Sequence, residues 1–238
     1  MSLIIIPARY ASTRLGVKML KTVNGKPLIQ HTYENAQQAN LPIIIAVDDV
    51  RLERAALAFG ADVCLTHTQH ISGTSRISEV IEKRSIADDE VIINVQGDEP
   101  LLPSVLIKQT ADNLHKTNAD VATLRQQISN PEQINDPNCV KVVVDYHDYA
   151  LYFSRALIPN ARSKTDLPVF KHIGLYAYRA GFIKKLVKMP ASPLEKTEKL
   201  EQLSVLWHGF NIHTAEAKAQ AGIGIDTIED LQAFRRMI

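Results

Sequence analysis

Cysteine, long apolar stretches and net charge are all scarce in this chain of 238 residues. Its two cysteines, Cys64 and Cys139, are too few for a disulfide framework and predict a reducing compartment. No apolar run exceeds about six residues, whereas a membrane helix needs roughly 20, and the N-terminus lacks the basic start of a signal peptide. Lysine and arginine total 27 against 26 acidic residues, without the basic excess of a duplex-binding protein. We therefore expect a cytoplasmic protein with neither a membrane nor a nucleic acid as its partner.

Several common catalytic motifs are also missing. No G-x-x-x-x-G-K-[ST] run is present, which disfavours a Walker-type NTPase. Gly222-Ile223-Gly224 begins like a dinucleotide-binding fingerprint, but Thr227 occupies the third glycine position. The motif also lies near the end of the chain instead of directly after the first strand. No G-x-S-x-G frame marks a nucleophilic serine. Cys64, His67 and His70 have the residue types of a zinc site, but a fourth ligand is not evident, so we interpret their spacing as chance.

Short apolar runs alternate with amphipathic segments through the first 120 residues. This rhythm is typical of a parallel sheet covered by helices, and right-handed crossovers then give a doubly wound α/β fold. The predicted strands are 3–6, 43–47, 62–65 and 91–95. The predicted helices run from about 28 to 39, from a cap at Asp48 or Asp49 to Phe59, and over 75–83 and 104–116, with Pro27 as a first helical residue.

The rhythm changes after about residue 120, where strand-like segments follow one another with fewer helices between them. These segments are 121–124, 140–144, 150–153 and 171–178, and helices are predicted over 193–207 and 227–236. The polar, proline-containing stretch 160–169 is predicted to be an exposed loop. No linker or internal repeat interrupts the chain, so we expect a single domain over 1–238 whose second part is a smaller mixed-sheet lobe.

Positive charge is concentrated immediately after the first predicted strand. Residues 1–33 hold no acidic residue but include the basic side chains of Arg9, Arg14, Lys18, Lys21 and Lys26. Ligands of open α/β sheets bind beyond the carboxyl ends of the strands, where this segment is expected to lie. It therefore suits a polyphosphate, although a merely solvated basic surface has the same composition.

Two acidic residues follow glycines at predicted rims of the sheet. Asp98 follows the apolar run 91–95 through Gln96-Gly97, and Asp226 follows Gly224-Ile225. Such carboxylates beside a cationic loop suit Mg²⁺ held between the protein and substrate phosphates. Alternatively, each aspartate caps a helix or a turn. Similarly, Ser72-Gly73-Thr74 before Arg76 suits contact with a nucleotide, or else Thr74 caps the next helix.

A second group of polar residues suggests a pocket for a polyhydroxylated acid. His172, Gly174, Tyr176 and Tyr178 alternate along one face of a predicted strand, and Arg155 follows another strand within possible reach. On the predicted helix 193–207, an apolar stripe is separated from a polar face. The stripe comprises Leu200, Leu203 and Trp207, and the polar face Glu198, Glu201 and Gln202. Arginine suits a carboxylate and glutamate suits hydroxyls, but surface ion pairs and ordinary strand packing explain the pattern equally well.

These motifs, taken in order, resemble those of the 3-deoxy-D-manno-octulosonate cytidylyltransferases. The resemblance extends nearly end to end. Its blocks are 5–15 (IIPARYASTRL), 24–29 (NGKPLI), 72–74 (SGT), 94–101 (NVQGDEPL), 151–156 (LYFSRA), 171–179 (KHIGLYAYR), 194–195 (LE), 200–203 (LEQL) and 224–227 (GIDT).

The resemblance implies a Rossmann-like nucleotidyltransferase fold, a homodimer and Mg²⁺-dependent transfer of CMP from CTP to the anomeric hydroxyl of 3-deoxy-D-manno-octulosonate (Kdo) for lipopolysaccharide synthesis. It implies catalytic roles for Lys18, Arg9 and Asp98, and Mg²⁺ binding by Asp98 and Asp226. The implied nucleotide-binding residues are Ala8, Arg9, Arg14, Lys18, Ser72, Thr74, Arg76 and Gln96. The implied sugar-acid ligands are Arg155, His172, Tyr176, Glu201 and Gln202.

The chain departs from the family pattern in two places close to this chemistry. The phosphate loop reads Arg14-Leu15-Gly16-Val17-Lys18, without the family's prolines and with the glycine one place earlier. Ser75 stands where the family usually has an acidic residue, which predicts that Arg76 loses an orienting partner. These departures keep two other hypotheses open: a nucleotide-binding relative with weakened catalysis, and an enzyme for another ulosonic acid such as 8-amino-Kdo.

Overall fold

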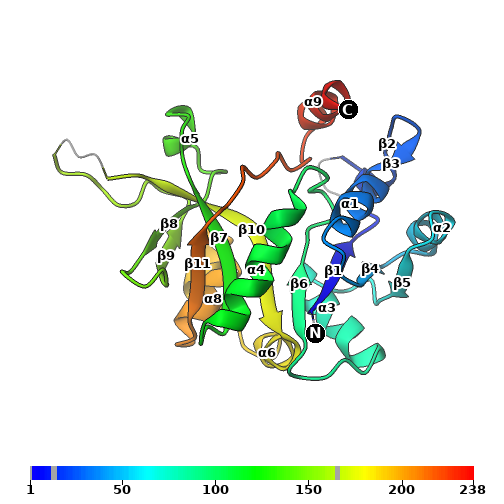
Figure 1. Ribbon diagram of the computed structural model, residues 1–238, viewed down its shortest axis with the longest axis horizontal. Coiled ribbons are helices and arrows are strands. Elements are labelled where there is room, and N and C mark those ends of the chain that lie inside the picture. The colour runs from blue at the N-terminus through cyan, green and yellow to red at the C-terminus, as the bar shows by residue number, and fades with distance from the viewer. Residues whose placement is uncertain (1, 12–14, 164–166) are drawn as a thin grey trace.

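The computed structural model describes residues 2–11, 15–163 and 167–238. Within these ranges a nine-stranded sheet runs through the molecule, with helices on both faces (Figure 1). Its strands are β1 (Ser2–Ala8), β4 (Ile43–Val47), β5 (Asp62–Leu65), β6 (Val91–Asn94), β7 (Val121–Gln127), β8 (Lys141–Val144), β9 (Ala150–Ser154), β10 (Phe170–Arg179) and β11 (Ile212–Glu216). A two-stranded ribbon is formed by β2 (Thr22–Val23) and β3 (Lys26–Pro27).

The helices of the described ranges are α1 (Leu28–Gln37), α2 (Val50–Ala58), α3 (Gly73–Lys83), α4 (Ser104–Lys116), α5 (Glu132–Asn135), α6 (Ala180–Leu186), α7 (Pro193–Glu198), α8 (Gln202–Trp207) and α9 (Ile228–Met237). A single 3₁₀ turn, η1, spans Lys18–Leu20. Asp49 caps α2 through the N–H of Arg51, as the sequence predicts, whereas Pro27 precedes α1 instead of forming its first turn.

The strand order confirms the predicted α/β class with its mostly parallel first part. The main path is β11-β7-β10-β6-β1-β4-β5. Strands β6, β1, β4 and β5 are parallel neighbours, but β10 lies antiparallel between β6 and β7. β8 and β9 extend the sheet beside β10 as an antiparallel hairpin, which gives the expected mixed lobe.

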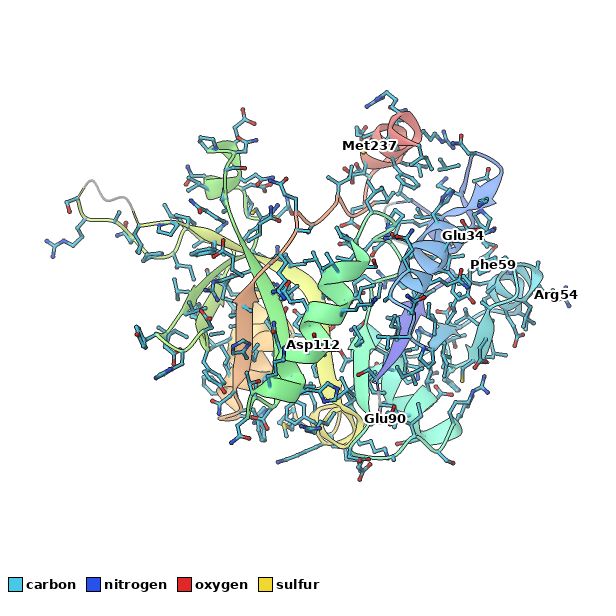
Figure 2. The ribbon with its side chains drawn as sticks, in the orientation of Figure 1. Glu34, Arg54, Phe59, Glu90, Asp112 and Met237 are labelled. Carbon is cyan, nitrogen blue, oxygen red and sulfur yellow. The ribbon has the colours of Figure 1, made fainter. Side chains whose placement is uncertain are left out.

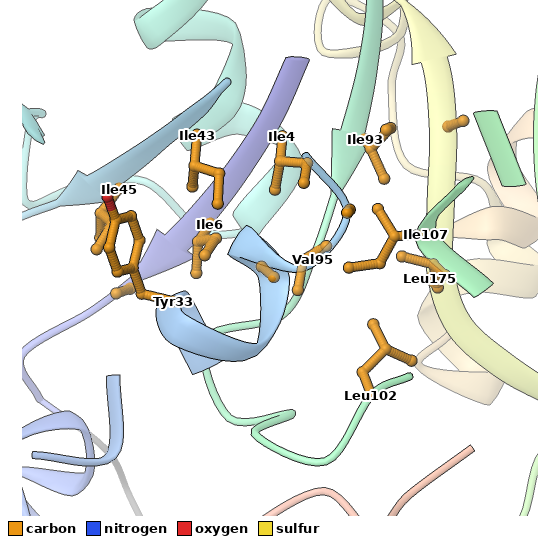
Figure 3. Close-up of a cluster of buried hydrophobic side chains, with 14 of the residues drawn as sticks. Ile4, Ile6, Tyr33, Ile43, Ile45, Ile93, Val95, Leu102, Ile107 and Leu175 are labelled. Carbon is orange, nitrogen blue, oxygen red and sulfur yellow. The ribbon is translucent and has the colours of Figure 1, made fainter. Parts of the chain in front are cut away.

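Both faces of the sheet are apolar because both are covered. On β1, Ile4 and Ile6 enter one core with α1 and α4, which Figure 3 shows in part, while Ile5 enters the opposite core with α3, α6 and α8. All three isoleucines are fully buried. This alternation fixes the register of β1, since a slip by one residue would exchange its two faces.

A third cluster joins the two ends of the described chain. Leu231 and Phe234 of α9 pack with Leu15, Val23 and Leu28. α9 therefore lies near the ribbon β2–β3 and the start of α1, and Figure 1 shows it apart from the strand β11 that precedes it. The segment between β11 and α9 crosses the carboxyl edge of the sheet to reach this position.

One helix prediction is wrong, and several elements were not predicted. The predicted helix 193–207 is two helices, because Lys199 adopts a left-handed conformation (φ 55°) that ends α7. Consequently Trp207 is 53% exposed, while Leu200 and Leu203 are buried as predicted. The elements α5, α6, η1, β11 and the ribbon have no counterpart among the predicted elements.

Candidate functional site

A cavity of about 260 Å³ opens at the carboxyl edge of β1 and β6. It collects residues that are distant in the sequence but lie on strand ends, on the first turn of α3 and on the segment before α9. Among its walls are Ala8, Arg9, Lys18, Ser72, Arg76, Gln96, Asp98, Glu201 and Asp226. The structure thus brings together most of the residues predicted for the nucleotide and the metal; Arg14 lies outside the described residues.

The side chain of Lys18 joins the two predicted metal ligands. Its Nζ donates to Oδ2 of Asp98 at 2.6 Å and to Oδ1 of Asp226 at 3.0 Å. Only 8% of the Lys18 side chain is exposed, whereas 28% of the Asp98 side chain and 52% of the Asp226 side chain are exposed. Two carboxylates from segments far apart in the sequence therefore converge on one buried positive charge. Hard oxygen donors that converge on a cation in this way fit the requirements of Mg²⁺.

Local hydrogen bonds bring Asp226 to this position. The N–H of Ile225 donates to the carbonyl of Asp98 at 2.8 Å, which ties the crossing segment to the turn after β6. A Cβ on Gly222 would lie 2.4 Å from Cβ of Leu101, so the segment approaches the turn as closely as glycine permits. Thr227, not Asp226, caps α9, in a capping box with Asp230. The capping alternative for Asp226 is therefore wrong, and its carboxylate is directed to Lys18.

Glu99 adds a third acidic side chain beside this pair. Burial and the nearby charges of Asp98 and Asp226 raise the pKa of Glu99 to about 8. Glu99 was given no role from the sequence, although this residue directly follows Asp98. The acidic surroundings favour a cation between Asp98 and Asp226.

The start of the phosphate loop is anchored by Asp48 at the end of β4. Oδ1 of Asp48 accepts from the N–H of Tyr10 at 2.7 Å, and Oδ2 accepts from Nη2 of Arg76 at 3.1 Å. The guanidinium of Arg51 lies over the ring of Tyr10, 3.8 Å from its centroid. Arg9, which borders the cavity and is exposed, is thus held next to a fixed residue. From the sequence, Asp48 is predicted only as a candidate helix cap.

Arg76 keeps an acidic partner despite the serine at position 75. Its guanidinium is buried and donates to Asp48, to the hydroxyl of Thr66 and to the carbonyl of His67. The prediction that Ser75 deprives Arg76 of an orienting partner is therefore wrong. Ser75 instead completes a capping box with Ser72 at the start of α3. Ser72 is the cap, so Thr74 is not, and its hydroxyl donates to Oε2 of Glu201 at 3.2 Å.

The altered phosphate loop is accommodated by glycine. Gly16 takes a left-handed conformation with φ 62°, whereas Val17 has a negative φ of −83°. The following turn η1 places Lys18 in the cavity. The glycine at position 16, one place earlier than in the family pattern, therefore adopts a positive φ.

A second cavity of about 300 Å³ adjoins the first, since Gly73, Gln96 and Glu201 border both. Its other polar residues include the predicted His172, Tyr176 and Gln202, together with Gly174, Tyr178 and Asn94. The predicted shared face of β10 is thus confirmed. Burial lowers the pKa of His172 to about 3 and raises the pKa of Tyr176 and of Glu201, the last opposed by the hydrogen bond from Thr74. His172 and Tyr176 are consequently uncharged at neutral pH, while Lys199 and Glu201 also place ionisable side chains at the border of the cavity.

Arg155 and Glu198 do not border the second cavity. Nε of Arg155 donates to the carbonyl of Glu198 at 2.7 Å, and Nη1 donates to the carbonyl of Pro137 at 2.9 Å. The carboxylate of Glu198 accepts from the hydroxyl of Ser154 and from the N–H of Arg155. The helix break at Lys199 explains this arrangement, because it leaves carbonyls at the end of α7 that Arg155 satisfies. The predicted face of Glu198, Glu201 and Gln202 is therefore divided between two sides of the break.

The zinc-like spacing has another use. Oε2 of Glu79 accepts from the ring of His70 and from the N–H of His67. Among the described residues, no group of three or more histidine, cysteine or acidic side chains forms a metal cluster. Nor does any helix in the described ranges have the length and apolar character to cross a membrane.

The geometry supports transfer between two substrates. The first cavity offers lysine, arginine and the positive end of α3 to an anion, while the adjoining cavity offers hydrogen-bonding groups to a polar acceptor. A family model described as Cytidylyltransferase matches residues 3–215. The chain belongs to the cytidylyltransferase family. Curated cytidylyltransferases are similar to this chain over nearly their full length.

The chain is 49% identical to the 3-deoxy-manno-octulosonate cytidylyltransferase 1 of Actinobacillus pleuropneumoniae serotype 5b, over 99% of this chain and 98% of the relative. It is 50% identical to the 3-deoxy-manno-octulosonate cytidylyltransferase of Vibrio cholerae serotype O1, over 99% and 96%. A solved structure of CMP:2-keto-3-deoxy-manno-octonic acid synthetase complexed with CTP superposes with a TM-score of 0.93 at 41% identity, covering 99% of this chain and 97% of that one. A 4-diphosphocytidyl-2C-methyl-D-erythritol synthase, 12% identical with a TM-score of 0.65, shares the fold.

Proposed function

We propose that this chain transfers CMP from CTP to the anomeric hydroxyl of Kdo, forming CMP-Kdo for lipopolysaccharide synthesis and releasing pyrophosphate. The observation that carries the proposal is the pair of adjoining cavities in a chain about 49% identical, nearly end to end, to 3-deoxy-manno-octulosonate cytidylyltransferases. CTP occupies the first cavity and the sugar acid the second. The shared border at Gly73, Gln96 and Glu201 is where the two substrates meet.

The residues of the first cavity neutralise and orient the triphosphate. Arg9 and Lys18 supply positive charge together with Arg14, which lies outside the described residues. Ala8, Ser72 and Gln96 of the first cavity lie around the nucleotide, and so does Thr74, which borders the second cavity. Arg76 acts through Asp48, because its guanidinium is already committed to that carboxylate, to Thr66 and to a carbonyl. The sugar oxygen attacks the α-phosphorus in line with departing pyrophosphate, so positioning and neutralisation of charge provide most of the rate acceleration.

Asp98 and Asp226 would hold Mg²⁺, in keeping with their convergence on the ammonium of Lys18. When bound, Mg²⁺ supplies charge neutralisation for the phosphates. In the complex with CTP, Nζ of Lys18 would exchange these two ion pairs for phosphate oxygens.

In the second cavity, His172, Tyr176, Glu201 and Gln202 bind the sugar acid. Arg155 contributes by holding the end of α7, through its bonds to the carbonyls of Glu198 and Lys199, while it retains its present conformation. Binding of the sugar carboxylate by its guanidinium requires that these bonds be exchanged.

The enzyme acts in the cytoplasm, where CTP is available, as a homodimer. Exposed apolar side chains on the lobe of β8 and β9 support this assembly: Tyr146 is 97% exposed and Leu151 is 62% exposed. Sedimentation equilibrium is expected to give about twice the chain mass of 26.5 kDa. A monomer at the concentrations used for assay would contradict the dimer.

The deciding experiment measures pyrophosphate release by the purified chain with CTP, Mg²⁺ and Kdo. Asp98→Asn is expected to abolish release, whereas Asp112→Asn, on the exposed side of α4 in Figure 2, is expected to retain it. Omission of Kdo or of Mg²⁺ is expected to stop the reaction. A parallel reaction with 8-amino-Kdo identifies an enzyme for that sugar. Folded protein that binds CTP but releases no pyrophosphate with either sugar would instead be the catalytically weakened relative.

A further inference from the structure

The pairing of β10 with β7 is interrupted between Ile173 and Tyr176, at the edge of the second cavity. Thr123 of β7 lies at this interruption and is fully buried. Its Oγ1 is 3.0 Å from the carbonyl oxygen of Ile173, 2.7 Å from that of Leu175 and 2.9 Å from Nε2 of His172. One hydroxyl therefore contacts both carbonyls of the interruption and the ring of a predicted substrate ligand.

The number of hydrogens at this hydroxyl determines which ring nitrogen is protonated. Carbonyl oxygens only accept hydrogen bonds, so a hydrogen directed to Nε2 would leave two oxygens at 2.7 and 3.0 Å from Oγ1 with no hydrogen between them; the contacts favour a hydrogen directed to Leu175 or Ile173. The oxygen of Thr123 is then available only as an acceptor for His172. Nε2 must therefore carry a hydrogen, and in the neutral ring Nδ1 carries a lone pair.

The surroundings of the ring keep it neutral and fixed in orientation. Phe153 contacts it edge-on with a centroid separation of 5.0 Å, and Tyr176 lies 5.2 Å away. Burial lowers the pKa of His172 to about 3, so the second nitrogen is unprotonated near neutral pH. Within the described chain, no hydrogen-bond partner occupies Nδ1, while the ring borders the second cavity. The neighbouring Gly174 leaves open space where a side chain would stand.

We propose that Thr123 is a positioning residue that holds His172 as its Nε2–H tautomer, so that Nδ1 accepts a hydrogen bond from a hydroxyl of the sugar acid. The recognition step rests on the proposed function, whereas the tautomer does not. In this state His172 selects a hydroxyl and disfavours a carboxylate, because two acceptors oppose each other. The sugar carboxylate is then bound elsewhere in the cavity.

Three variants separate this role from ordinary packing. Thr123→Val keeps the shape but removes the hydroxyl, and it is expected to raise the KM for Kdo by roughly 3- to 10-fold, the loss of one hydrogen bond. Thr123→Ser restores the hydroxyl and is expected to restore the KM. Thr214→Val is the matched control. Thr214 of β11 lies opposite Thr123 of β7 and is equally buried, and its hydroxyl has no hydrogen-bond partner among the described residues. The KM for CTP is expected to stay unchanged in all three.

Nitrogen-15 NMR of the ring of His172 tests the tautomer without turnover. In the free wild type, Nε2 is expected in the protonated range and Nδ1 in the unprotonated range, and Thr123→Val is expected to mix the two tautomers. Protonation at Nδ1, a doubly protonated ring at pH 7, or an unchanged KM for Kdo in Thr123→Val would each overturn the proposal. If the wild type releases no pyrophosphate, the proposed function fails, and the NMR spectrum still decides the role of Thr123.

Discussion

Lys18 is the residue whose position the chemistry depends on most. Its place in the basic segment after the first strand predicts a phosphate ligand, and the glycines before Asp98 and Asp226 predict that both aspartates lie at the rim of the sheet. Ligands of open α/β sheets bind at this rim, so these three could be expected together. Their direct ion pairs could not, because Lys18 and Asp226 are 208 positions apart in the sequence.

Replacing Lys18 tests this arrangement. Lys18→Ala is expected to lower kcat by about 10²–10³, as does loss of one charge-stabilising donor elsewhere. Lys21→Ala, which removes a less buried lysine at the end of the same turn, is expected to leave kcat nearly unchanged. Thermal shift with Mg²⁺ alone provides a second measurement. The shift is expected to be larger in Lys18→Ala, since no ammonium then competes for the two carboxylates. Equal rates in both variants would contradict the assigned role.

Asp48 is the residue that sequence reasoning missed. Two adjacent aspartates after β4 both satisfy the pattern of a helix cap, and the partner that distinguishes them, Arg76, lies 28 positions away. Asp49 is indeed the cap, paired with the exposed Arg51. Burial separates the roles of the two neighbours, and burial is not visible in a pair of identical letters.

This difference predicts unequal stabilities. Asp48→Ala leaves the buried guanidinium of Arg76 without its counter-charge and is expected to lower the free energy of unfolding by about 3–5 kcal/mol. Asp49→Ala removes a cap and is expected to cost about 1 kcal/mol. Urea denaturation of both variants measures the two values. Similar losses would show that Asp48 is not the more important of the pair.

At the scale of elements, apolar strands were predictable and polar or broken elements were not. β6 reads Val-Ile-Ile-Asn and is buried on both faces, so its composition determines its structure. β11 reads Ile-His-Thr-Ala-Glu and is a strand because β7 offers it a parallel edge. Nothing in the sequence around Lys199 indicates a left-handed residue. Its conformation leaves carbonyls at the end of α7, and these are bound by Arg155, which is remote in the sequence. Tertiary contacts therefore determined these elements more than local preference did.

The connection between β5 and α3 depends on pH through Glu79. Burial alone raises the pKa of this carboxyl, but hydrogen bonds from Lys83, from the N–H of His67 and from His70 outweigh burial and lower the pKa to about 2. The folded pKa lies below the ordinary value of 4.5, so the stabilisation is present above about pH 4.5 and is lost as the pH falls towards 2.

Glu79→Gln removes this dependence. The free energy of unfolding of the wild type is expected to exceed that of Glu79→Gln at pH 6, and the difference is expected to shrink steadily towards pH 3. Urea denaturation at a series of pH values measures this difference. Glu82→Gln is the control, because Glu82 is an exposed residue of the same helix. A difference that does not vary with pH would indicate that the carboxylate contacts are unimportant for stability.

At the scale of the whole molecule, the alternating rhythm predicted the layers but not the strand order. Antiparallel β10 enters between β6 and β7, which places His172 and Tyr176 beside Gln96. No local pattern specifies that neighbour, since both β6 and β7 present suitable edges until the chain is folded. The contact of α9 with the first residues of the chain is of the same kind.

α9 is expected to stabilise the site as well as the fold. Phe234 is 1% exposed and packs against Leu15 and Val23, next to the turn that carries Lys18. Phe234→Ala is expected to lower the free energy of unfolding by about 3–5 kcal/mol and to reduce CMP transfer. Met237, labelled on α9 in Figure 2, is 60% exposed, and Met237→Ala is expected to change the free energy of unfolding by less than about 0.5 kcal/mol. Denaturation and pyrophosphate release measure both variants.

The ion pair between Lys18 and Asp226 also makes catalysis a reporter of complete folding. The pair closes a loop of 208 positions, whereas the parallel strands β1 and β4 meet over a much shorter separation. Short loops close at lower entropic cost, so the early half of the sheet can assemble before the two ends of the chain meet. During refolding from denaturant, secondary structure is therefore regained first, and activity returns only in the step that joins α9 to the beginning of the chain.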